Sequence, residues 1–239
     1  MALFPLVLII ALGVVVLFII FRTSAGVNSD ILDNVQEHVF PPTNDLPDRP
    51  IPFGYKRSWM AISSTHSKKI LKDLGIKHFI SSNWASGLQY TRHGSYFFIS
   101  PPLGNWTLVI NDIAYDDQFK PMLERLSEEF GEVQAFATDR RSEYHFWARA
   151  VNGVTLRYCS FSDDGVTVNG APSTIEQDNK GLKIFQDITP EAYKQLLVND
   201  IEYWPSEDDV MEIAGHWSIN PCELHQQEAV GLGILGYRP

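Results

Sequence analysis

The sequence predicts an α+β fold: an antiparallel sheet with helices packed mainly on one face, preceded by one N-terminal transmembrane helix. Three observations predict it. Residues 133–161 form three runs rich in aromatic and β-favouring side chains, separated by two turn signals, which indicates a three-strand meander. Residues 117–130 repeat apolar side chains at helical spacing. Residues 2–21 form an uncharged apolar run.

The apolar run predicts a membrane anchor over residues 1–22. Its length suits a helix that crosses a hydrocarbon core of ~30 Å, so residues 2–21 would contact the lipid bilayer. A cleaved signal peptide is the alternative, because Thr23-Ser24-Ala25 resembles a cleavage site. No Lys or Arg precedes the run, and it exceeds the roughly 7–15 apolar residues of a signal peptide, so we favour the anchor. The single flanking charge, Arg22, leaves the side of the membrane open.

A proline-rich spacer is expected over residues 23–52, followed by one α+β globular domain over residues 53–239. The spacer lacks an apolar period, and proline restrains both its own backbone and that of the preceding residue. A semi-rigid connection is therefore expected. Its prolines are Pro41, Pro42, Pro47, Pro50 and Pro52.

Apolar periodicity and turn signals place the remaining elements of the domain. Strands are expected at residues 58–63, 95–100 and 106–110, and helices at 66–74, 117–130, 190–199 and 206–215. Residues 83–88 predict a helical turn or loop, and residues 162–180 a polar loop with a short hairpin. The glycine-rich tail, residues 231–239, receives no element.

The dipeptide Asn152-Gly153 predicts a two-residue type I′ turn, which sets the register of the meander. The expected pairs after this turn are Val151 with Val154, Arg149 with Leu156, Trp147 with Tyr158, and His145 with Ser160. The loop 139–142 would pair Thr138 with Glu143 and Phe136 with His145.

Alternation along the strands then sorts the meander into two faces. One face is rich in small and apolar residues, which would let a helix such as 117–130 pack closely: Val133, Ala135, Ala137, Tyr144, Phe146, Ala148, Ala150, Cys159 and Phe161, together with Thr155 and Arg157. The other face mixes aromatic and ionisable groups: Gln134, Phe136, Thr138, Glu143, His145, Trp147, Arg149, Leu156, Tyr158 and Ser160.

The mixed face supplies the candidate binding residues. Tyr, Trp and Arg dominate interface hot spots because they bury a large area and make directed polar contacts. The alternative is that a C-terminal helix covers this face and makes it part of the core. A second interpretation is a hydrolytic Glu143–His145–Ser160 set, although nucleophilic serines usually lie on tight turns. The candidate binding residues are Phe136, Glu143, His145, Trp147, Arg149 and Tyr158.

Composition and motif spacing exclude several classes of function. The formal net charge of −10 disfavours nucleic acid as a partner. No zinc-type spacing or phosphate loop occurs, so no metal, cofactor or catalytic residue is predicted. The match of residues 231–236 to GxGxxG lies too near the end of the chain for a nucleotide fold. Cys159 and Cys222 lack CxxC spacing, and two separate thiols are favoured over one disulfide.

Four pieces of the sequence resemble uncharacterised bacterial proteins: Asn83-Trp84-x-x-Gly87-Leu88, Ser100-Pro101-Pro102 with Trp106-Thr107-Leu108, Trp147-Ala148-Arg149-Ala150, and Ala214-Gly215-x-Trp217-Ser218-x-x-Pro221. The resemblance spans residues 53–236 and implies a bacterial source, and with the anchor a single-pass protein of the inner membrane. It implies no activity.

The expected function is therefore a membrane-tethered protein-binding module, in one concrete form an immunity-type inhibitor of a toxin or effector. The sequence leans away from an enzyme. The alternatives are an envelope hydrolase that uses Glu143 and His145, or a structural envelope component without a discrete site.

Overall fold

The structure is a computed structural model that describes residues 39–93, 95–111, 119–162, 165–178 and 204–238. Residues 41–239 belong to one compact unit, and residues 1–40 to another. The expected anchor (residues 2–21) and helix (190–199) lie outside the described residues. Within the described ranges, no helix is long and apolar enough to cross a membrane.

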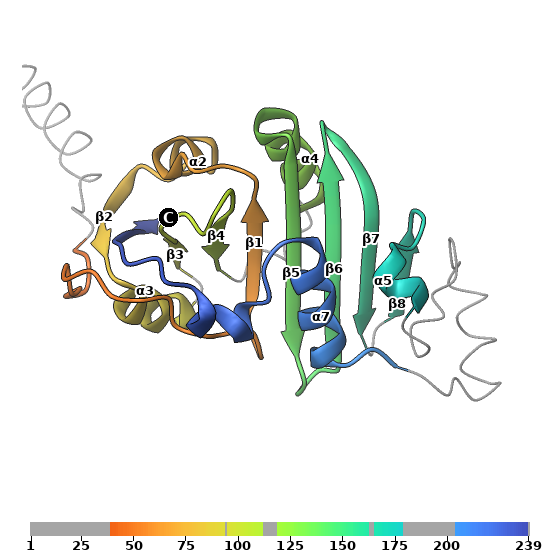
Figure 1. Cartoon of the computed structure of the whole chain (residues 1–239). Helices are drawn as coiled ribbons and strands as arrows, with labels where there is room; N and C mark the ends of the chain where they lie inside the picture. Colours follow the sequence, from red (N-terminus) through yellow and green to blue (C-terminus); the bar gives the residue numbers. More distant parts are fainter. Residues whose placement is uncertain (1–38, 94, 112–118, 163–164, 179–203, 239) are drawn as a thin grey trace, which may run out of the picture. The chain divides into compact units, whose positions relative to one another are not determined.

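An open antiparallel sheet forms the centre of the 41–239 unit (Figure 1). The described residues contribute nine strands to it, in the order β2-β9-β3-β4-β1-β5-β6-β7-β8. Every neighbouring pair is antiparallel, as the sequence predicts for the meander. The strands are β1 (Ser58–Ile62), β2 (His78–Ser82), β3 (Tyr96–Ile99), β4 (Thr107–Ile110), β5 (Glu132–Asp139), β6 (Tyr144–Val151), β7 (Val154–Ser162), β8 (Gly165–Asn169) and β9 (Gly233–Tyr237).

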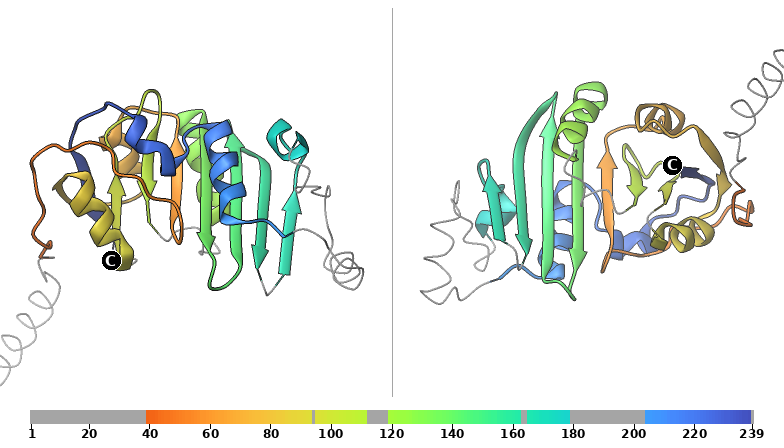
Figure 2. Two further views of the ribbon diagram at one scale, coloured as in Figure 1. Left: turned by 60° about the horizontal axis from the view of Figure 1, so that its bottom comes forward. Right: turned by 180° about the vertical axis from the view of Figure 1, so that it is seen from behind.

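Helices cover both faces of the sheet, which corrects the expectation of helices mainly on one face. In Figure 1 and Figure 2, α4 and α7 lie on opposite sides of β5 and β6. Because alternate residues of a strand point to opposite faces and both are apolar here, each face needs its own cover. On one side lie α2 (Ser67–Asp73) and α4 (Phe119–Phe130). On the other lie α3 (Trp84–Tyr90), α5 (Thr174–Asp178), α7 (Glu207–Trp217) and the 3₁₀ turn η3 (Pro221–Gln226).

The small-residue face of β5 and β6 packs against α4, as the sequence predicts. The helix buries Phe119, Leu123 and Leu126 in one stripe, and the alanines of the two strands let it approach closely. The ring of Phe119 meets that of Phe146 edge to face, with 5.5 Å between centroids. The predicted assignment of faces is therefore confirmed for β5 and β6.

The register of β7 differs from the prediction, and a β-bulge is the reason. Val151 pairs with Val154 as expected, but the register shifts between Arg149 and Ala150, so that Trp147 pairs with Cys159. A one-residue slip moves every later side chain to the other face. Cys159, Phe161 and Arg157 therefore lie on the face of Trp147, whereas the sequence had placed them opposite.

The bulge points Arg157 into the interior, where it meets Glu176 of α5. Nε of Arg157 donates to Oε1 of Glu176 over 3.0 Å, and the two side chains are 2% and 0% exposed. Nε1 of Trp147 donates to the same oxygen over 2.9 Å. Oε2 accepts from the backbone and the hydroxyl of Ser173, at 2.7 Å each. The carboxylate thus accepts hydrogen bonds from three segments of the chain.

Residues 41–52, which the sequence predicts as part of the spacer, pack along α3. Asp48 accepts hydrogen bonds from the first backbone amides of this helix, at Trp84 (2.7 Å) and Ala85 (3.1 Å). Asn44 and Ser86 are also hydrogen-bonded, at 3.0 Å. These contacts satisfy amide groups that a helix start leaves open, and the folded unit therefore begins before residue 53.

Candidate binding pocket

The segment that leads into β1, residues 51–57, is named the strap. Its backbone takes positive φ at Gly54 (+142°) and at Lys56 (+55°). A Cβ atom at Gly54 would lie 2.7 Å from Sδ of Met211 in α7, and glycine adopts this positive φ with less strain than other residues. A non-glycine residue at positive φ is uncommon and needs surrounding contacts to hold it.

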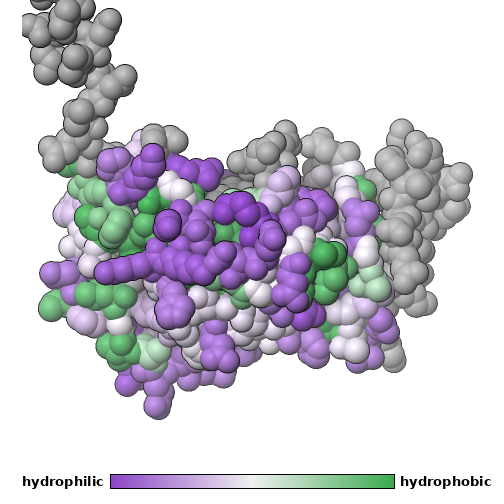
Figure 3. Space-filling view, turned by 90° about the horizontal axis from the view of Figure 1, so that it is seen from above, coloured by the Kyte–Doolittle hydropathy of each residue, from purple (hydrophilic) through white to green (hydrophobic). Residues whose placement is uncertain are grey.

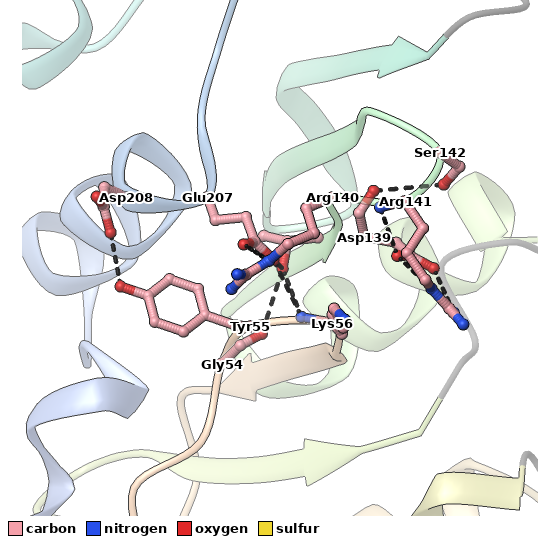
Figure 4. A network of polar contacts seen from close by, with 10 residues as sticks. Gly54, Tyr55, Lys56, Asp139, Arg140, Arg141, Ser142, Glu207 and Asp208 are labelled. Atoms are coloured by element: carbon pink, nitrogen blue, oxygen red, sulfur yellow. Dashed lines mark hydrogen bonds and ion pairs between the residues drawn. The ribbon is translucent and has the colours of Figure 1, made fainter.

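Those contacts come from the first turn of α7 and from β5, as Figure 4 shows. The Tyr55 phenol donates a 2.6 Å hydrogen bond to Oδ1 of Asp208. The backbone amide of Lys56 donates to the Thr138 hydroxyl (3.0 Å) and to Oε1 of Glu207 (3.3 Å). Two adjacent carboxylates of α7 therefore fix two adjacent residues of the strap.

A cation completes this network. Nε of Arg140, in the β5–β6 turn, lies 2.6 Å from Oε2 of Glu207. The guanidinium also lies over the ring of Tyr55, 5.5 Å from its centroid (Figure 4). Such a cation–π contact and ion pair stabilise a partly exposed site only modestly, but together they link the strap to a second hairpin.

The local sequence explains why the acidic side chains lie at this position. Ser206 caps α7: its hydroxyl accepts from the amide of Asp209, and the Asp209 carboxylate accepts from Ser206 in return. This capping box starts the helix at Glu207. The acidic first turn also complements the positive end of the helix dipole, which leaves Glu207 and Asp208 directed at the strap.

A pocket of about 700 Å³ lies between the strap, α3 and η3. Its volume falls within the range of pockets that bind small ligands or single side chains. Part of its wall is apolar, from Ile51, Pro52, Phe53, Ala85 and Leu88. The polar groups on the wall are those of Tyr55, Arg57, Gln89, Arg92 and Cys222.

Arg57 is the buried cation of this pocket, with 8% of the residue exposed. Nη2 donates to the backbone carbonyl of Leu88 over 2.7 Å, and Nη1 to the Thr91 hydroxyl over 3.1 Å. Both acceptors lie at the C-terminal end of α3, where the helix dipole favours a positive charge. The guanidinium is therefore held in one orientation.

The two groups of the pocket that could act as nucleophiles are both held protonated. The hydrogen bond to Asp208, followed by burial, raises the pKa of Tyr55 to about 12. Burial, and next the charge of Asp208, raises the pKa of the Cys222 thiol. That thiol donates to the carbonyl of Phe53 over 3.2 Å. At neutral pH both groups are hydrogen-bond donors and not anions.

Two of the predicted binding residues, Phe136 and Trp147, are fully buried. The ring of Phe136 stacks on that of Trp59, with 5.2 Å between centroids. Trp147 stacks on Phe161 at 5.3 Å and donates its indole N–H to Glu176. The alternative that a C-terminal helix covers this face holds here, because α7 packs on β5 and β6.

The residues of the predicted hydrolytic set do not come together. His145 is 3% exposed, and its Nδ1 has no hydrogen-bond partner among the described residues. Glu143 lies in the β5–β6 turn, exposed and at positive φ. Ser160 pairs with Phe146, so the bulge turns its side chain to the opposite face from His145.

The remaining two candidates lie on different faces. Arg149 forms a half-buried ion pair with Glu132, with Nε 2.7 Å from Oε1, and lies over the ring of Trp217. Tyr158, expected beside Trp147, lies opposite and meets the ring of Phe146 at 5.2 Å. The six candidates therefore form no common surface.

The sequence does not reveal the strap, Arg57, Arg92 or Cys222 as site residues. These positions are far apart along the chain and share no motif, and the strap lay at the expected boundary between spacer and domain. A charged residue directly before an all-buried strand, Arg57 before β1, was the available signal. Cys159 and Cys222 are both free thiols. The described residues hold no cluster of three or more His, Cys, Asp or Glu that could bind a metal ion.

Apolar side chains also occur on the outer surface, but in separate places. The face seen from above in Figure 3 is mostly hydrophilic, with apolar atoms in small patches. Scattered exposed apolar residues are normal for a folded protein. The pocket is therefore the stronger candidate site.

Comparison of the chain with family models, with curated proteins and with solved structures gives no match.

Proposed function

We propose that this chain is a membrane-tethered protein-binding module, anchored in a bacterial inner membrane through residues 2–21, whose folded unit engages a protein partner at the pocket behind the strap. The observation that supports this is a pocket of about 700 Å³ whose polar groups are oriented by the fold. An immunity-type inhibitor of a toxin or effector is the concrete form that we favour.

The protonation and the fixed orientation of the polar groups support a binding function over a catalytic one. Tyr55 and Cys222 keep their protons at neutral pH, for the reasons given above. Arg57 is fixed by a carbonyl and a hydroxyl. Because the Tyr55 hydroxyl and the Cys222 thiol already donate to Asp208 and to Phe53, the fixed guanidinium of Arg57 is the group of these three that can recognise a ligand with little loss of conformational entropy.

The exposed residues that line the pocket support a protein as the partner. Among the residues that line the pocket, Tyr55 and Ile51 are 45% and 37% exposed, and Arg92 is also exposed. Tyr and Arg around a pocket are typical of interface anchors. The formal charge of −10 would steer a basic partner toward the domain and speed association at low salt.

Affinity capture with the full chain tests this proposal. The bait is compared with Ala85→Trp, which fills the pocket from an exposed position, and with Arg125→Gln, a control on α4 on the other side of the sheet. We expect one protein that the wild type and the control recover from the source cell and that Ala85→Trp does not. Equal recovery by all three baits, or recovery of none, contradicts the proposal.

Resistance to carbonate extraction tests the tether. A full-length chain that stays with the membrane pellet supports it, and release into the supernatant contradicts it. Because this measurement does not involve the pocket, the tether and the binding site can fail separately.

A further inference from the structure

We propose that the pocket recognises a carboxylate attached to an apolar group, an inference that rests on the proposed binding function and names the chemistry of what is bound. Two features of the described residues carry it: two guanidinium groups on the wall and apolar side chains on the same wall.

The guanidinium groups supply the charge. Arg57 and Arg92 both line the pocket, one from the strap and one from the 3₁₀ turn η1 (Thr91–His93) that follows α3. A guanidinium stays protonated at all pH values that proteins tolerate and matches a carboxylate with two parallel N–H donors. The described part of the chain gives Arg92 no ion pair.

The orientation of Arg57 adds selectivity. The Leu88 carbonyl and the Thr91 hydroxyl accept hydrogen bonds from Nη2 and Nη1 of its guanidinium. Those bonds fix the plane of the guanidinium, so that an incoming carboxylate meets a donor whose rotamer is already set. Gln89, which also lines the pocket, has a side-chain amide that can donate to a ligand.

The apolar wall specifies the rest of the ligand. The apolar side chains of Ile51, Pro52, Phe53 and Leu88 line the same pocket as Arg57. Burying an aliphatic side chain of the size of leucine against this surface is favourable because it removes apolar area from water. A small inorganic anion would leave this surface unfilled.

A phosphate fits less well for an electrostatic reason. Phosphate sites typically use the N-terminus of a helix, where amide groups point at the anion. The end of α3 nearest to Arg57 is its C-terminus, whose carbonyl groups carry partial negative charge. These carbonyl groups repel any anion, and they repel a phosphate dianion more strongly than a carboxylate monoanion.

The ligand chemistry has two sources: the C-terminal apolar residue of a polypeptide, or a free carboxylic acid. Calorimetric titration of the full chain in lipid nanodiscs distinguishes them with three probes: N-acetylleucine, its amide N-acetylleucinamide, and 4-methylpentanoate. N-acetylleucine carries the peptide group that precedes a C-terminus, and 4-methylpentanoate lacks it. Tighter binding of N-acetylleucine than of 4-methylpentanoate indicates a polypeptide end, and the reverse order a free acid.

The amide is the test of charge recognition. We expect it to bind about 10- to 100-fold more weakly than the acid, the range for losing a hydrogen bond to a charged group. Equal binding of acid and amide overturns the carboxylate inference and leaves the proposed binding function intact. Binding of none of the three probes also overturns it, and the capture experiment with Ala85→Trp then decides the proposed function independently.

Variants locate the effect in the pocket. Arg92→Gln, at an exposed position, is expected to weaken binding of the acid about tenfold and to leave binding of the amide unchanged. Arg57→Gln is expected to abolish the preference for the acid, and its thermal melting curve shows whether the variant is folded. Arg125→Gln, on the other side of the sheet, should match the wild type. Loss of acid binding in Arg125→Gln as well would contradict the assignment.

Discussion

The phenol of Tyr55 and the carboxylate of Asp208 share a 2.6 Å hydrogen bond that joins the strap to the first turn of α7. The two residues are 153 positions apart in the chain. The bond holds one wall of the pocket against a capped helix, so the shape of the pocket depends on a contact that forms only in the folded state. It also makes the stability of the strap sensitive to pH.

Tyr55→Phe should remove this dependence. The hydrogen bond to Asp208 raises the folded-state pKa of Tyr55 to about 12, above the ordinary value of 10.0. The contribution of this bond to stability is therefore complete below pH 10 and declines as pH rises from 10 toward 12. Urea denaturation of both proteins between pH 8 and 11 should show a difference in the free energy of unfolding that shrinks above pH 10.

Asp208→Asn is the matched variant for this prediction. It keeps an acceptor for the phenol but removes the charge, so the pH course above pH 10 should become shallower than in the wild type. A difference between wild type and Tyr55→Phe that is the same at pH 8 and pH 11 would show that the hydrogen bond does not hold the strap.

Glu176→Ala is predicted to be one of the most destabilising single changes in the domain. It leaves the buried guanidinium of Arg157 without its partner, at an expected cost of about 3–5 kcal/mol in the free energy of unfolding. The double variant Arg157→Met with Glu176→Leu removes both charges and should cost much less. Urea denaturation measures both. A double variant as unstable as the single one would assign the cost to lost packing instead of the unpaired charge.

His145 should make the domain less stable in mild acid. Burial lowers its pKa below 6.5, although the charges of Glu143, Glu207 and Asp209 oppose the shift. The unfolded chain then binds more protons than the folded one, so stability is present above pH 6.5 and declines as pH falls below it. His145→Leu removes the titrating group, and its free energy of unfolding should fall less than that of the wild type between pH 7 and pH 5. Equal losses in both proteins would contradict this.

The sequence predicted the two faces of β5 and β6 correctly although the turn between them was placed wrongly. Phe136 pairs with Trp147 and not with His145, a shift of two residues. Because side chains alternate with a period of two, such a shift preserves both faces. The bulge in β7 is a shift of one residue, which reverses them. Alternation along one strand cannot reveal an extra residue that the neighbouring strand leaves unpaired.

The tail was missed as a strand for a different reason. β9 lies between β2 and β3, and its glycines lower the β-propensity by which strands are recognised. The structure shows why they are needed: a Cβ at Gly233 would lie 2.5 Å from the carbonyl of Ile99, and one at Gly236 2.6 Å from Ile76. The pocket was missed because its walls come together only through such long-range packing. Periodicity within a segment carries no information about it.

Gly170 tests whether the bulge in β7 is a fixed part of the fold. A Cβ at this position would lie 2.0 Å from the carbonyl oxygen of Leu156, the residue that the bulge leaves unpaired, and φ is +82°. Gly170→Ala must therefore displace backbone and not only a side chain, which should push β8 away from β7. We expect a larger loss of stability than the roughly 1–2 kcal/mol that a left-handed backbone alone costs a non-glycine residue.

Gly104→Ala separates the cost of backbone strain at positive φ from the cost of the collision with the Leu156 carbonyl. Gly104 also has positive φ (+60°), but a Cβ there would meet nothing within 4 Å, so this variant carries the backbone strain without the collision. Urea denaturation compares the two variants, and amide hydrogen exchange reports whether β8 opens in Gly170→Ala alone. Equal losses of stability would mean that the Leu156 carbonyl moves aside at little cost. In that case the inward position of Arg157, which the bulge sets, would depend mainly on its ion pair with Glu176.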